Sequence, residues 1–131
     1  MGAMVLTWED VVALAQQLPG VEEASWYRTP GLKVGGKGFA RLRAEAEGGL
    51  VLMCGLEEKE ALLTSGDPAF YTTPHYDGYG AIIVNLELVD PDEFAELLEE
   101  SWRIKASARL RAARDALDRQ PPAATGSTRR E

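Results

Sequence analysis

Two glycine pairs, Gly35-Gly36 and Gly48-Gly49, divide the first half of this 131-residue chain into short stretches that favour strands. Gly35-Gly36 has the length of a two-residue hairpin turn, and glycine supplies the positive φ that such turns need. Each pair therefore joins two strands that run in opposite directions. The pattern predicts an antiparallel meander of three or four strands, at residues 25–28, 32–34 (after a Pro30-Gly31 turn), 39–44 and 50–53.

Capping signals mark where the expected helices begin. Thr7 followed by Asp10 has the form of a helix N-cap box, and Asp90-Pro91 places a capping aspartate before a proline at the first helical position. The last helix carries an apolar stripe to about Leu117, and we expect it to be continuous or mildly bent near Lys105. Between these helices we expect a short helix at 57–65 and strands at 70–73 and 81–88.

The resulting order is one helix, three or four strands, a helix, two strands and a helix. This order predicts an α+β fold, a two-layer domain in which helices pack against one antiparallel sheet of about five to six strands. We expect a single domain over residues 4–117. Residues 1–3, which precede a second methionine, have the form of an expression-vector remnant, and 118–131 are expected to be a disordered tail.

The counts of cysteine and histidine limit the chemistry. The single Cys54 cannot form an internal disulfide, and with His75 as the only imidazole there is no Cys/His set for zinc. We therefore expect no metal and no cofactor, and a reducing, cytoplasmic setting. No apolar run approaches the roughly 20 residues that span a bilayer, so no membrane association is expected.

Charge is unevenly distributed along the chain. The net charge of −7 and the pI of about 4.8 argue against a protein built to hold polyanions. However, twelve acids and a single lysine fall between residues 57 and 100, whereas five cations and no acid fall between residues 28 and 43. A basic face can therefore form on an acidic protein. Its candidate residues are Arg28, Lys33, Lys37, Arg41 and Arg43.

The stretch from Thr73 to Gly80 holds the only histidine and two of the four tyrosines. Together with four other motifs it resembles the MmcQ/YjbR family of small bacterial proteins, from about residue 8 to about residue 110. The other motifs are Trp26, Pro30, Val34-Gly35-Gly36-Lys37 and Phe39-Ala40. The resemblance implies a compact α+β domain (YjbR-like or CyaY-like), labelled DNA-binding, with no catalytic residue set. Family members commonly carry Pro-Lys where this chain has Ser107-Ala108, which removes a helix breaker and one cation.

Two functional hypotheses follow. In the first, the protein is a non-enzymatic DNA-binding protein whose basic glycine hairpin contacts phosphates, with Arg41 and Arg43 on one strand face. Such binding would be weak and salt-dependent. In the second, these cations only balance the acidic middle of the chain, and a loop binds a protein partner or a small ligand. The loop residues are His75, Tyr76, Asp77 and Tyr79.

Catalysis is not expected from either region. Residues 31–38 are one position short of a phosphate-binding P-loop, because Gly38 stands where a serine or threonine is needed. His75 and Asp77 could form an acid/base pair, but no nucleophile motif accompanies them. The sequence leaves open whether the protein is a monomer or a weak dimer.

Overall fold

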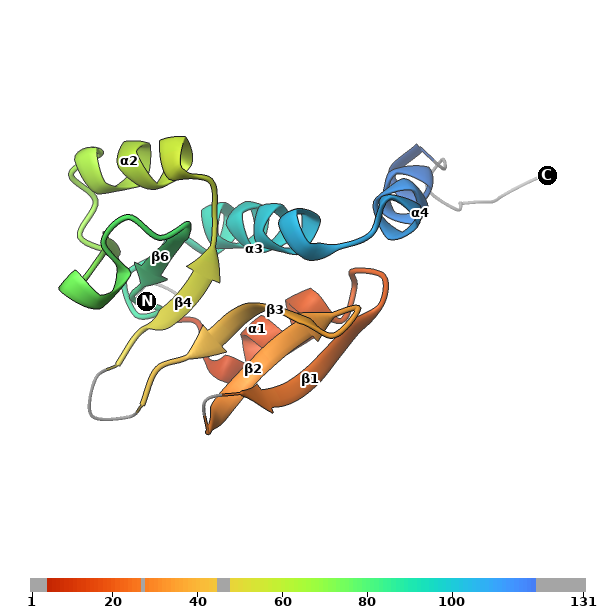
Figure 1. Cartoon of the computed structure of the whole chain (residues 1–131), viewed down its shortest axis with the longest axis horizontal. Coiled ribbons are helices and arrows are strands. Elements are labelled where there is room, and N and C mark those ends of the chain that lie inside the picture. The colour runs from red at the N-terminus through yellow and green to blue at the C-terminus, as the bar shows by residue number, and fades with distance from the viewer. Residues whose placement is uncertain (1–4, 27, 45–47, 120–131) are drawn as a thin grey trace.

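Six strands form one antiparallel sheet in the order β1-β2-β3-β4-β6-β5 (Figure 1). The structure is a computed structural model that describes residues 5–26, 28–44 and 48–119. The strands are β1 (Val21–Trp26), β2 (Thr29–Val34), β3 (Lys37–Leu42), β4 (Leu50–Met53), β5 (Phe70–Tyr71) and β6 (Ala81–Val84). The predicted α+β class and antiparallel sheet are confirmed.

The two helices with predicted capping signals, at Thr7 and at Asp90-Pro91, begin where those signals placed them. The helices of the structure are α1 (Trp8–Ala15), α2 (Leu56–Thr64), the 3-10 helix η1 (Pro74–Tyr76), α3 (Pro91–Lys105) and α4 (Ala108–Arg119). Thr7 and Asp10 form the reciprocal capping box, and the Asp90 carboxylate accepts the N–H of Glu93 at 2.9 Å. In the part of the chain that the structure describes, no helix is both long and apolar enough to cross a membrane.

The main core lies between one face of the sheet and the helices α1 and α3. A row of paired residues on β2, β3, β4 and β6 forms its floor: Leu32, Ala40, Leu52 and Ile82. Trp102 of α3 is fully buried there, and its indole N–H donates to the carbonyl of Pro19 at 2.9 Å. The opposite face of the sheet, called the second face below, carries a smaller apolar cluster of Val51, Ala81 and Ile83, against which Tyr71 and Tyr76 pack.

The last helix differs from both predicted forms. Instead of continuing or bending mildly, α3 ends at Lys105, Ala106 is extended with ψ 149°, and α4 starts at Ala108. Ser107 supplies the physical reason, because its hydroxyl accepts the N–H of Leu110 at 3.2 Å and so caps a new helix without a proline. The helix α4 also extends two residues past the predicted domain boundary at 117. Residues 118 and 119, predicted as the start of a disordered tail, therefore belong to α4, whereas residues 1–3, predicted as a remnant, and the rest of the predicted tail, 120–131, lie outside the described residues.

Several strand boundaries also need correction. Pro30-Gly31 is not a turn but lies inside β2, where Pro30 pairs with Ser25 of β1 and stands one residue beyond the last β2–β3 pair, Gly31 with Arg41. The missing proline N–H therefore removes no bond to β3. The strand predicted at 25–28 is β1, which starts at Val21 and ends before Arg28, whose φ is 67°. The strand predicted at 81–88 stops at Val84, because the Asn85 side chain accepts the N–H of Glu87 and turns the chain.

Candidate nucleic-acid interface

The register of the sheet separates two of the predicted phosphate contacts, Lys37 and Arg41. Arg41 pairs with Gly31 and Val51, so it belongs to the second face, whereas Lys37 pairs with the core residue Val34. Paired residues of antiparallel strands project to the same side. A bulge between these two pairs leaves Phe39 as an extra residue on β3, so Lys37 and Arg41 project from opposite faces.

Lys33 lies on the second face but near the hairpin end of the sheet. It pairs with Gly38 on one side and with Glu22 of β1 on the other. The carboxylate of Glu22, which lies directly opposite Lys33 on the neighbouring strand, offsets the positive charge of the lysine. The basic glycine hairpin predicted from the sequence therefore does not present its two lysines and its arginines as one surface.

The three arginines gather at the other end of the sheet. Arg28 lies in the turn between β1 and β2, is exposed, and lines a surface depression of about 820 Å³ together with Arg43. The guanidinium of Arg43 donates to the carbonyl of Gly48 at 3.2 Å, within the wall of the same depression. Arg41 borders this depression, since its guanidinium donates to the lining residue Thr29 at 3.3 Å.

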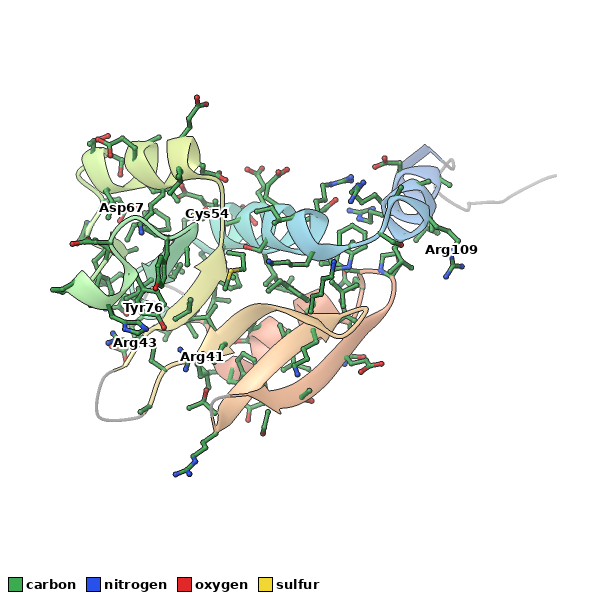
Figure 2. The ribbon with its side chains drawn as sticks, in the orientation of Figure 1. Arg41, Arg43, Cys54, Asp67, Tyr76 and Arg109 are labelled. Atoms are coloured by element: carbon green, nitrogen blue, oxygen red, sulfur yellow. The ribbon has the colours of Figure 1, made fainter. Side chains whose placement is uncertain are left out.

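Arg41 also joins the basic strand to the histidine-tyrosine loop. Its Nη2 donates to the hydroxyl of Tyr76 at 2.7 Å, across 35 positions of sequence. Figure 2 shows Arg41, Arg43 and Tyr76 at the same end of the molecule. The basic strand and the loop, which the sequence presents as alternative sites, are therefore neighbouring parts of one surface.

A buried lysine on α2 fixes this loop. The Lys59 side chain is 5% exposed, and its Nζ donates to the carbonyls of Tyr76 at 2.5 Å and Tyr79 at 2.8 Å. Because a buried ammonium group must be compensated by hydrogen bonds, these two contacts hold the loop backbone against α2. Sequence reasoning missed this role. The sequence did contain a signal of it: Lys59 shares a helical face with Leu62 and Leu63, and a lysine on an apolar face is expected to be buried.

The end of the loop is fixed to β4. The N–H of Cys54 donates to the carbonyl of Gly80 at 2.9 Å, and a Cβ on Gly80 would come within 2.7 Å of the Cys54 carbonyl oxygen. The Cys54 thiol is buried. Its burial, followed by the nearby Glu58 carboxylate, raises the pKa of this thiol to about 11, so it is unreactive at neutral pH.

Three aromatic rings of the loop contact one another edge to face. The ring centroids of His75 and Tyr76 are 4.8 Å apart, those of His75 and Tyr79 6.2 Å, and those of Tyr76 and Tyr79 6.4 Å. Tyr76 is half-buried, His75 is exposed, and Tyr79 is 59% exposed. Asp77, the fourth residue predicted for this loop, is exposed beside them.

Comparison with known proteins gives three findings. The YjbR family model matches residues 16–104 of the chain. Uncharacterized proteins from Mycobacterium tuberculosis and Mycobacterium bovis are 28% identical to it over 119 residues, covering 79% of this chain and 92% of theirs. A crystal structure of a Deinococcus radiodurans protein of the domain family DUF419 matches with a TM-score of 0.68 and 20% identity, covering 83% of this chain and 88% of that one. The structural match supports the α+β fold.

Proposed function

This chain belongs to the YjbR family, and we propose that it is a non-enzymatic DNA-binding protein that contacts phosphates through Arg28, Arg41 and Arg43. Of the five phosphate contacts predicted from the sequence, the proposal keeps three, because the register puts Lys33 and Lys37 near the other end of the sheet. It assigns no catalytic step to any residue.

The observation that carries the proposal is the grouping of three arginine residues at one depression. Arg28 and Arg43 line it and Arg41 borders it, although they come from a turn, the end of a strand and the strand itself. Guanidinium groups suit phosphate because their planar N–H donors match its oxygens in pairs. The hydrogen bonds from Arg41 to Tyr76 and Thr29 fix one of these groups before any ligand binds.

The rest of the molecule opposes such binding. The net charge is −7, and Glu45 and Glu47, which follow Ala44 in the sequence, lie outside the described residues. We therefore expect weak, salt-dependent affinity. Three phosphate contacts predict that raising salt from about 50 to about 150 mM weakens binding roughly tenfold for a single strand and roughly twentyfold for a duplex.

Fluorescence anisotropy with labelled duplex and single-stranded DNA at both salt concentrations tests the proposal. The test variant is Arg28→Gln with Arg43→Gln. The matched control is Lys33→Gln with Lys37→Gln, which also removes two positive charges but from the opposite end of the sheet. We expect the arginine variant to lose most of its affinity and to reduce the salt slope by about 1.4 to 1.8, and the lysine variant to change little.

Two results would contradict the proposal. The first is no binding of either DNA form at tens of micromolar protein in low salt. The second is an equal loss in both variants, which would mean that the overall charge rather than the arginine group governs binding.

A second candidate function uses the loop alone. In it, His75, Tyr76, Asp77 and Tyr79 bind a protein partner or a small ligand, and the protein has no nucleic-acid role. The exposure of His75 and Tyr79 on a backbone fixed by Lys59 favours this reading. A wild-type protein that fails to bind DNA in the titration above, but whose ligand binding is abolished by His75→Ala with Tyr79→Ala, would establish it.

A further inference from the structure

We propose that the rings of His75, Tyr76 and Tyr79 form a stacking platform for unpaired bases beside the arginine group. This makes a single strand of nucleic acid the ligand class of the site. The inference rests on the proposed function, since the phosphates of the strand would be held by Arg28, Arg41 and Arg43.

The platform has the composition that single-strand binding requires. Proteins that bind single strands combine cations along the backbone with aromatic rings on which bases stack. Here His75 and Tyr79 are exposed, and Tyr79 leaves 59% of its surface to solvent. Edge-to-face contacts at 4.8 to 6.4 Å between the three rings brace them against one another.

The platform is also fixed in position. Lys59 donates to the carbonyls of Tyr76 and Tyr79, and Tyr76 packs against the apolar cluster of the second face. Because the rings are already held in place, little conformational entropy is lost when a ligand stacks on them.

A direct contact connects rings and cations. The hydroxyl of Tyr76 accepts a hydrogen bond from Arg41 at 2.7 Å, so the aromatic rings are in direct contact with the arginine group. A strand whose phosphates follow the arginines can therefore place adjacent bases over the rings. In a duplex the bases are already paired and stacked, and they reach such rings only after unpairing, which costs free energy that a single strand does not spend.

The test compares two single strands of equal length, about 12 nucleotides, within the range of single-strand site sizes. One strand is oligo-thymidine, and the other has the same phosphates but abasic residues throughout. We expect the base-containing strand to bind at least about fivefold more tightly, the effect of one stacked base. An oligo-uridine strand of the same length shows whether DNA or RNA is the better source of the bases.

Variants of Tyr79 assign the difference to the platform. Tyr79→Ala should remove most of the preference for bases and leave the affinity for the abasic strand unchanged. Tyr79→Phe should keep the preference, because the ring is retained. The residue is exposed, so neither change should unfold the protein.

The outcomes separate this inference from the proposed function. Equal binding of the abasic and base-containing strands would overturn the stacking platform and leave phosphate binding intact. An equal loss of affinity for both strands in Tyr79→Ala would overturn the platform in the same way. Failure of every strand to bind at low salt would overturn the proposed function and the platform together.

Discussion

Replacing Lys59 by methionine should destabilise the protein through the loop that carries Tyr76 and Tyr79. Methionine keeps an unbranched apolar side chain inside the protein but removes the ammonium group that donates to the two loop carbonyls at 2.5 and 2.8 Å. The side chain is 5% exposed, so water has little access to the position that the ammonium group now occupies. The two carbonyl oxygens then lack their partner.

The expected loss follows from these two contacts. Leaving a buried acceptor unpaired costs about 1 to 3 kcal/mol, so two acceptors set a range of about 2 to 6 kcal/mol. Two effects reduce this loss: the variant no longer buries a charge, and water can reach the exposed part of the loop at residues 77–80. We therefore expect a net loss of about 2 kcal/mol, which lowers the melting temperature by about 8 °C in a domain of this size.

Urea denaturation monitored by circular dichroism measures this loss. Lys37→Met is the matched control, because it makes the same chemical change at an exposed position and should alter stability by less than about 0.5 kcal/mol. If the Lys59 and Lys37 variants unfold at the same urea concentration, Lys59 does not hold the loop and the reasoning is wrong.

Two further predictions concern Gly49 and Cys54. Gly49→Ala should lower stability by about 2 kcal/mol more than Gly48→Ala. Both glycines have positive φ, but only at Gly49 would a Cβ meet the Tyr71 hydroxyl at 2.5 Å, so thermal unfolding of the two variants isolates the clash. Burial raises the pKa of Cys54 to about 11, so the folded protein holds this proton to higher pH than the unfolded chain, whose thiol ionises near pH 9. Stability should therefore fall between about pH 9 and 11, and Cys54→Ala, compared by denaturation across that range, should lack this part of the loss.

The parts of the fold that were predicted correctly depend on short-range chemistry. The capping box at Thr7, the Asp90-Pro91 helix start and the Gly35-Gly36 hairpin each follow from residues within a few positions of one another. The break at Ala106 is not predicted by the sequence pattern, because the apolar stripe continues through it and no proline stands there. The serine at 107 nevertheless caps a new helix, since its hydroxyl accepts the N–H of Leu110.

The composition of the candidate site depends on longer-range contacts. The hydrogen bond between Arg41 and Tyr76 joins residues 35 positions apart in the sequence. The two hydrogen bonds of Lys59 join residues 17 and 20 positions apart. No local pattern specifies which arginine meets which tyrosine. The sequence could therefore name the residues of both regions but could not show that they share a surface.

The side of the sheet from which each cation projects was the property hardest to predict from the sequence. Lys37 and Arg41 are four positions apart, and in a regular strand they would project to the same side. The bulge at Phe39 adds one residue and reverses this, so a variant that changes both cations alters two faces at once. Phe39 and Ala40 are consecutive apolar residues, and both are buried in the main core. Two neighbours on a regular strand cannot both face one core, so the bulge is what lets both residues enter it. The sequence does not reveal this, because the regular strand β4 also carries consecutive buried residues, Val51 and Leu52, which face opposite sides of the sheet.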